Sequence, residues 1–125
     1  MKRIIATEKA PKAVAAYSQA VEMNGTLFIS GQVPLDSSTG KFVEGGIEEQ
    51  TLQVMINIGA ILETAGYLYA DVVKSTCFLS DIANFKAMND VYGQFYPENK
   101  PARSAFAVRD LPLGALIEIE TIAMK

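Results

Sequence analysis

Hydrophobic residues return at helical spacing in the middle of this chain. From Ile47 the apolar positions follow one another at steps of three and four residues as far as Ala65, which predicts a helix with one apolar face. Glu48 and Glu49 lie in its first turn, where the helix dipole favours negative charge. Gly66 stands where a C-terminal cap belongs, so the helix is expected to end there.

A shorter helix is predicted further along the chain. Ser80 and Asp81 can cap its first turn, and Pro97 ends it. The apolar residues on one side of this helix are Ile82, Phe85, Met88, Tyr92 and Phe95. The run from Val72 to Leu79, between the two predicted helices, is typical of a strand.

Both ends of the chain have strand and turn character. Their short apolar runs cover 13–21, 26–33, 101–108 and 116–123. Asn24-Gly25, between the first two runs, is the dipeptide of a tight hairpin turn. The order of these elements predicts one α+β domain, residues 1–125, with two helices on one face of a sheet.

The last predicted strand has apolar residues on both of its sides. Ile117 and Ile119 share one side, whereas Leu116 and Ile122 share the other. Two helices cover only one face of a sheet, so we expect the second face to pack against another subunit in a homo-oligomer. The alternative is a monomer in which loops cover that face.

Charge and composition exclude several functional classes. The net charge is −3, and the lysines and arginines are scattered, which disfavours nucleic-acid binding. No apolar stretch reaches the roughly 18 residues that a membrane helix needs, and the first residues lack the apolar segment of a secretory signal. We therefore expect a cytoplasmic protein with no membrane partner.

The chain contains no histidine and a single cysteine, Cys77. This composition excludes Ser-His-Asp and Cys-His catalysis, an internal disulfide, and metal sites made of histidines or several cysteines. Cys77 lies between apolar residues and is interpreted as a small core residue. Any catalysis must use carboxylates, Tyr, Arg, Lys, hydroxyls, backbone groups or bound water.

Charged residues interrupt the last two predicted strands. Arg103 shares a side of one strand with Ala105, and Glu118 and Glu120 share a side of the other. One interpretation is an ion pair on a partly exposed strand. The other is a site in which the guanidinium binds a small carboxylate through two parallel hydrogen bonds, while a glutamate holds a water or moves a proton.

Four further residues are weaker candidates by themselves. Tyr17, in an apolar stretch, is most simply a core ring. Ser30-Gly31, at a strand end, is interpreted either as a bulge or the start of a turn, or as a place where the backbone closely approaches a ligand. Asn89 on its own is a solvated residue of the second helix.

Several short stretches, taken in order, are specific where each alone is not. They are Ile5-Ala6-Thr7, Ala10-Pro11, Tyr17-Ser18-Gln19-Ala20, Ile29-Ser30-Gly31-Gln32-Val33-Pro34, Thr39-Gly40, Val73-Lys74-Ser75-Thr76, Asp81 with Phe85, Asn89 and Tyr92, Pro101-Ala102-Arg103-Ser104, and Ile117-Glu118-Ile119-Glu120. Over essentially its whole length the chain resembles the RidA (YjgF) family of reactive intermediate deaminases. The resemblance implies a chorismate-mutase-like, ferredoxin-related α+β fold that forms a homotrimer with active sites in clefts between subunits.

The resemblance also implies an activity. It implies hydrolysis of enamines and imines of the 2-aminoacrylate type, which arise from serine and threonine dehydratases, to 2-keto acids and ammonia. It implies no metal and no organic cofactor. The partners would be a small carboxylate substrate and further copies of the chain.

Roles for single residues follow from the same resemblance. Arg103 matches the family arginine that binds the substrate carboxylate, and Glu118 matches the glutamate that positions the attacking water, which leaves Glu120 structural. The positions that line the family cleft are Tyr17, Ser30, Gly31, Asn89 and Ala105. A well-studied subgroup has cysteine where this chain has Ala105, and Ala15-Ala16 replaces the usual Gly-Pro before the tyrosine.

Two other functions stay open from the sequence. The same cleft would serve a non-catalytic module that binds 2-keto acids or similar carboxylates. The alanine at position 105, where a subgroup of the family has cysteine, is compatible with this interpretation. Cleavage of RNA or inhibition of translation is the other, and the acidic balance and the absence of histidine argue against it.

Overall fold

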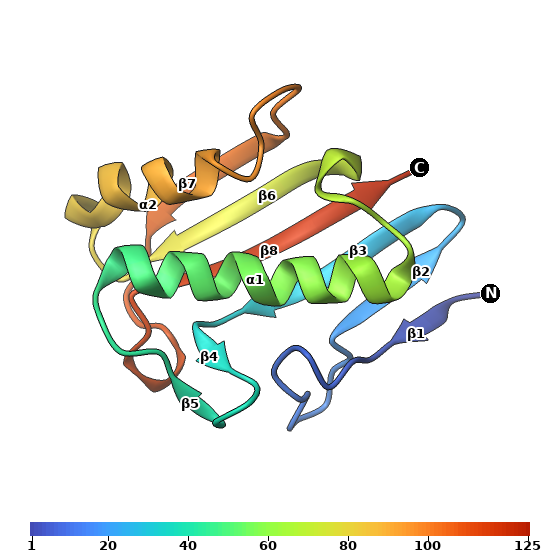
Figure 1. Cartoon of the computed structure of the whole chain (residues 1–125), viewed down its shortest axis with the longest axis horizontal. Helices are drawn as coiled ribbons and strands as arrows, with labels where there is room; N and C mark the ends of the chain where they lie inside the picture. The colour runs from blue at the N-terminus through green and yellow to red at the C-terminus, as the bar shows by residue number, and fades with distance from the viewer.

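The chain folds into a mixed sheet with two helices on one of its faces (Figure 1). The computed structural model describes all residues from 1 to 125. The strands of the sheet are β1 (Arg3–Ile5), β2 (Ala20–Met23), β3 (Thr26–Gln32), β6 (Val72–Leu79), β7 (Ala102–Ala107) and β8 (Ile117–Met124), and a separate small hairpin joins β4 (Leu35–Asp36) and β5 (Lys41–Phe42). The predicted α+β class is therefore confirmed.

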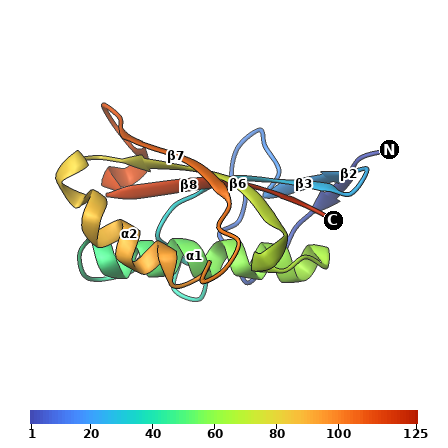
Figure 2. The same cartoon turned by 90° about the horizontal axis from the view of Figure 1, so that it is seen from above.

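The six strands lie in the order β1-β2-β3-β8-β6-β7, so that β1 and β7 are the edges. All neighbours are antiparallel except β6 and β7, which are parallel. Figure 2 shows α1 (Ile47–Ala65) and α2 (Phe85–Gly93) together on one side of the sheet. The other side carries only loops.

The first helix agrees with the prediction, whereas the second is shorter than predicted. Gly66 ends α1 with a left-handed φ of 87°, a conformation that glycine adopts without strain. Asp81 accepts a hydrogen bond from the backbone of Ala83, and this cap begins the short 3₁₀ turn η2 (Ile82–Asn84) rather than α2 itself. The remaining 3₁₀ turns are η1 (Tyr69–Asp71) and η3 (Pro112–Gly114).

The apolar run over 13–21 is largely a loop, and only its last two residues belong to β2. The side chain of Gln19 is buried. It forms hydrogen bonds with backbone groups that would otherwise need partners in a neighbouring strand. Its Oε1 accepts from the N–H of Thr7 at 2.7 Å, and its Nε2 donates to the carbonyls of Thr7 and Pro11 at 3.0 and 2.7 Å. An amide side chain can therefore hold an apolar segment as a loop.

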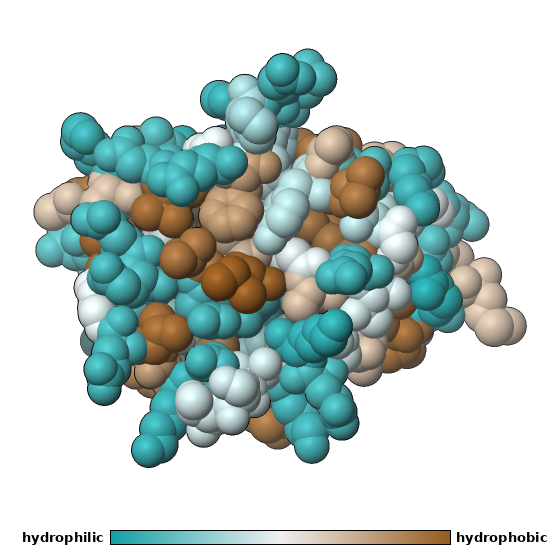
Figure 3. Space-filling model, in the orientation of Figure 1, coloured by the Kyte–Doolittle hydropathy of each residue, from teal (hydrophilic) through white to brown (hydrophobic).

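The two faces of the sheet differ in how they are covered. Ile117 and Ile119 of β8 are fully buried against the helices, in the core. On the opposite face Phe28, Phe106 and Met124 remain 49%, 46% and 51% exposed. The helix side, in contrast, presents a largely hydrophilic rim with hydrophobic residues over its middle (Figure 3). The open sheet face is thus the face that no helix covers.

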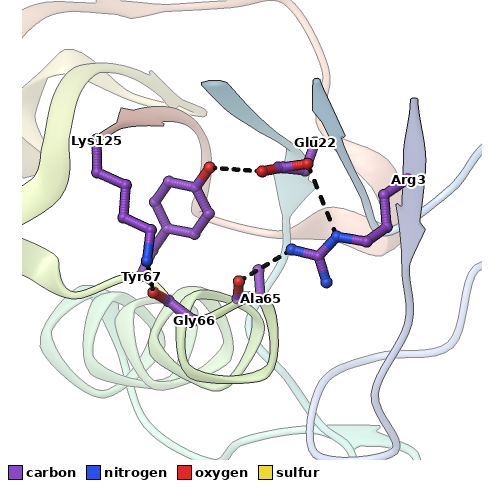
Figure 4. A network of polar contacts seen from close by, with 6 residues as sticks. All are labelled: Arg3, Glu22, Ala65, Gly66, Tyr67 and Lys125. Carbon is purple, nitrogen blue, oxygen red and sulfur yellow. Dashed lines mark hydrogen bonds and ion pairs between the residues drawn. The ribbon is translucent and has the colours of Figure 1, made fainter. Parts of the chain in front are cut away.

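A polar network ties the two ends of the chain to the end of α1 (Figure 4). Arg3 donates to the carbonyl of Ala65 at 3.1 Å and lies 3.7 Å from the carboxylate of Glu22. Lys125 donates to the carbonyl of Gly66 at 2.6 Å. Both cations lie at the C-terminus of a helix, where its dipole favours positive charge. The network anchors β1 and β8 against α1.

Candidate active site

Arg103 lies on the edge strand β7 and points toward the helix side of the sheet. Its guanidinium carbon lies 5.3 Å from the centre of the Phe85 ring and 5.0 Å from that of Tyr92, both on α2. Its Nη1 donates a hydrogen bond of 2.7 Å to Oδ1 of Asn89. No carboxylate forms an ion pair with it. The helix therefore holds a guanidinium in a defined place while its charge stays unneutralised.

Ala105 lies two residues further along β7 and faces the same way. It packs against the core and pairs in register with Cys77 of β6. Cys77 is fully buried, and burial raises the pKa of its thiol to about 11. A thiol of this kind stays protonated near neutral pH, as expected of the core residue that the sequence predicted.

Glu118 lies on β8, on the face away from the helices. Its neighbours Ile117 and Ile119 point into the core, so the alternation of the strand directs Glu118 to the open face. On the neighbouring strand, across from Glu120, β3 has an irregular register between Ile29 and Gln32, which corresponds to the bulge that the sequence suggested. Gly31 lies in this bulge, and a Cβ there would overlap Oε2 of Glu118 and lie 2.9 Å from its Cδ. Because Gly31 has no side chain, the carboxylate of Glu118 can lie next to its backbone.

An open groove of about 1120 Å³ contains Glu118. Tyr17, Ser30, Gly31 and Leu113 also line it. Ser30 fixes the neighbouring loop, because its Oγ donates to the carbonyl of Ser18 at 2.6 Å and its N–H donates to that of Gln19 at 2.9 Å.

Tyr17 corrects one interpretation drawn from the sequence. Its side chain is 50% exposed and lines the groove, so it is not a core ring. The apolar stretch around it lies on the loop that Gln19 anchors, outside the sheet. Apolar character alone could not distinguish these two environments.

The carboxyl group of Glu118 has a higher pKa than the side chain of an ordinary glutamate. Partial burial in the groove raises its pKa above the usual 4.5, and the negative charge of Glu120 raises it further. A carboxylate with a raised pKa is a stronger base, which suits it to accept a proton from water. Glu120 is exposed on the same face of β8 and contributes through its charge.

The candidate residues form two clusters within the chain, not one. Arg103 faces the helices and Glu118 faces the opposite side of the sheet, so the interpretation of an ion pair between them is wrong. Asn89 and Ala105 lie on the side of Arg103. The residues that line the groove with Glu118 are Tyr17, Ser30 and Gly31.

The sequence missed three residues that shape these clusters. Gln19 anchors the loop of the groove, and Phe85 and Tyr92 flank the guanidinium. A glutamine inside an apolar run was a signal for the first. The two aromatic residues were recognised as helix residues, but their contact with Arg103 depends on how α2 crosses β7.

The chain contains neither a cluster of metal-ligating side chains nor a membrane-spanning helix. No three or more histidine, cysteine, aspartate or glutamate side chains lie together in a way that could hold a metal ion. Neither helix is both long and apolar enough to cross a membrane.

Comparison with known proteins identifies relatives over the full length of the chain. The family described as Endoribonuclease L-PSP matches residues 7–125. The 2-iminobutanoate/2-iminopropanoate deaminase of Homo sapiens is 45% identical over 125 residues, which cover 100% of this chain and 91% of the human one. The chain belongs to the RidA/YjgF/L-PSP family. The resemblance found in the sequence is therefore confirmed.

Solved structures of RidA-family proteins have the same fold. RidA from an Antarctic Psychrobacter bacterium is 43% identical with a TM-score of 0.94, over 98% of this chain and 99% of that one. The E. coli protein TdcF, solved with bound serine, is 35% identical with a TM-score of 0.94, over 98% of each chain. The chain thus shares sequence with a relative named a deaminase, and fold with solved structures of a RidA protein and of TdcF.

Proposed function

We propose that this protein hydrolyses reactive enamine and imine intermediates of the 2-aminoacrylate type to 2-keto acids and ammonia. The proposal rests on the environment of Arg103. Its guanidinium is held in place and has no carboxylate partner in the chain, so it is available to bind the carboxylate of a substrate. The human relative, named a deaminase of two 2-imino acids, supports it. TdcF, solved with serine, supports a ligand that carries an α-carboxylate.

The two clusters are proposed to meet between subunits of a chorismate-mutase-like homotrimer. Each chain carries an Arg103 cluster on one side of its sheet and a Glu118 groove on the other. In a cyclic trimer the cluster of one chain can face the groove of the next, and the ring then closes with three equivalent sites. The exposed apolar residues of the open sheet face supply the surface for such contacts.

The proposed reaction requires mainly that the substrate and the attacking water are held in the correct positions. Arg103 would hold the carboxylate and so fix the imine carbon near the groove of the neighbouring chain. A water would attack this carbon of the protonated imine as the C=N electron pair moves to nitrogen, and Glu118 would accept the proton that the water loses.

The second half of the reaction returns that proton. The resulting carbinolamine takes the proton from Glu118 on its amine nitrogen, and the C–N bond breaks. The hydroxyl oxygen becomes the keto oxygen, and its proton leaves with ammonia as ammonium. Neither a metal nor an organic cofactor is required in this scheme, and Ala105 contributes only shape and backbone groups.

Turnover of an imine tests the proposal directly. An amino-acid oxidase generates 2-iminobutanoate in situ, and the purified protein should speed the release of ammonia above the spontaneous rate. Saturable binding of 2-oxobutanoate without any acceleration would instead favour a non-catalytic module for 2-keto acids.

The assembly gives a separate prediction. Sedimentation at micromolar concentration should give a particle of three times the 13.5 kDa chain mass. Mixed trimers made from Arg103→Ala chains and Glu118→Gln chains should recover activity, because about a quarter of shared sites then combine an intact arginine with an intact glutamate. A 13.5 kDa particle, or mixed trimers as inactive as their parents, would contradict inter-subunit sites.

Gly31→Ala should reduce kcat by about tenfold or more while leaving the chain folded, because its Cβ displaces the Glu118 carboxylate from its place. Gly93→Ala is a matched control, since a Cβ there meets nothing within 4 Å. Steady-state kinetics with the oxidase-generated imine measure the effect. Equal kcat in Gly31→Ala and Gly93→Ala would show that the position of Glu118 does not limit the rate.

A further inference from the structure

We propose that Asn89, Phe85 and Tyr92 are positioning residues that orient Arg103 so that its Nε–Nη2 edge takes the substrate carboxylate side-on. The inference rests on the proposed function and assigns a geometry and three roles to its carboxylate site. Arg103 forms one hydrogen bond in the chain, and that bond uses Nη1. Nε and Nη2 make none, and these two nitrogens form the edge that matches the two oxygens of a carboxylate.

The chemistry of the two side chains fixes the orientation of Asn89. A guanidinium has only donors, so the atom of Asn89 that lies 2.7 Å from Nη1 must be the carbonyl oxygen Oδ1. Rotation about the last bonds of Arg103 would break this hydrogen bond. Asn89 therefore does more than line the cleft, because it determines which edge of the guanidinium remains available.

The aromatic rings restrict the guanidinium further. The Phe85 and Tyr92 rings lie 5.3 and 5.0 Å from the guanidinium carbon, within the range of a cation–π contact. Tyr92 is itself held by Tyr96, whose ring centre lies 4.9 Å away. The Tyr92 hydroxyl is buried and makes no hydrogen bond, although Ser75 lies near it. The ring of Tyr92, rather than its hydroxyl, is the part that faces Arg103.

A pre-oriented fork distinguishes carboxylates from similar neutral groups. Two parallel N–H groups match two carboxylate oxygens, whereas a primary amide offers one oxygen and repels the second donor with its own N–H groups. A mobile guanidinium would have to be ordered at each binding event, which weakens affinity. The ligand class that this edge of the guanidinium recognises is thus a small molecule with a free carboxylate.

Calorimetry with pyruvate, and with its neutral analogue pyruvamide, tests these roles. Asn89→Ala and Tyr92→Leu should each weaken pyruvate binding by about tenfold, while Tyr92→Phe should stay within about twofold of wild type because it keeps the ring. Asn84→Ala, on the turn before the same helix, is the matched control and should not change the affinity. Pyruvamide should bind weakly and equally to all of these variants.

Nitrogen-15 NMR of the arginine side chains reports on orientation independently of affinity. Only Arg3, Arg103 and Arg109 contribute signals, and Arg109 is almost fully exposed. In the wild type, Arg103 should show separate Nη resonances from hindered rotation, and these should merge in Asn89→Ala and in Tyr92→Leu. Merged resonances in the wild type would overturn the proposal.

The outcomes separate this inference from the proposed function. If the wild type binds pyruvate with the expected pattern of variants but hydrolyses no imine, the positioning roles stand and the deaminase proposal fails. If it hydrolyses imines but the variants bind pyruvate as tightly as the wild type, the positioning proposal is wrong. Equal loss of pyruvate and pyruvamide binding would also overturn it, because such a loss indicates general damage to the cleft.

Discussion

Arg103→Ala should reduce kcat/KM for imine hydrolysis by about 10²- to 10³-fold, which corresponds to about 3 to 4 kcal/mol of lost transition-state binding. The guanidinium has no other charged partner in the chain, so its proposed partner is the substrate carboxylate. Removing it leaves that carboxylate without hydrogen bonds and lets the imine carbon move away from the groove. Initial rates with the oxidase-generated imine measure the loss.

Two further variants show whether the fork itself is responsible. Arg103→Lys keeps the positive charge but loses the paired N–H groups, and it should fall between the wild type and Arg103→Ala. Arg109→Ala removes an arginine that is almost fully exposed, and it should behave like the wild type. Circular dichroism should show the same secondary structure in all three. Wild-type turnover by Arg103→Ala would contradict the carboxylate site.

Glu118→Gln should lower kcat by about 10²- to 10³-fold while pyruvate binding persists, because glutamine fills the same space but cannot accept the proton from water. The residue that holds the substrate carboxylate is unchanged, so affinity and rate should separate. Single-turnover kinetics and calorimetry on the same preparation measure the two effects. An equal loss of rate in Glu120→Gln would show that the reaction uses the other carboxylate.

The pH dependence follows from the environment of Glu118. Burial and the charge of Glu120 raise its pKa above 4.5, so activity should decline on the acid side at a pH above that value. Glu120→Gln removes the neighbouring negative charge and should shift this decline to lower pH. An acid limb that does not move in Glu120→Gln would contradict the assignment of the limb to Glu118.

Stability should respond to the same group with a defined sign. The folded chain keeps a proton on Glu118 at pH values where the unfolded chain, with a pKa near 4.5, has lost it. The stability linked to this group is therefore present below pH 4.5 and is lost as the pH rises through the raised pKa. Glu118→Gln, which does not ionise, should unfold at a higher denaturant concentration than the wild type above that pH.

Much of the fold could be predicted because local patterns decide it. The spacing of apolar residues predicted α1, and Gly66 ends the helix where a left-handed residue is needed. Asn24-Gly25 makes the expected turn with positive φ at both residues. The loop before β2 was not predictable in this way, because the side chain of Gln19, and not the local pattern, determines its path.

The site residues were predictable by resemblance, but their arrangement was not. Period-two alternation shows which residues of one strand share a face, and so it grouped Arg103 with Ala105. It does not show how the faces of two strands correspond, since that depends on their pairing. The pairing of β7 and β8 with β6 places Arg103 toward α2 and Glu118 on the opposite side.

By itself the sequence determined which chemical groups are available to this protein: Arg103 and Glu118 in predicted strands, no histidine, and the family pattern around them. Only the tertiary structure decided that these two groups lie on opposite faces and that Gly31 makes room for the carboxylate of Glu118. The physical reason is that residue type is local information, whereas the face, the burial and the pKa of a side chain depend on elements distant in the sequence.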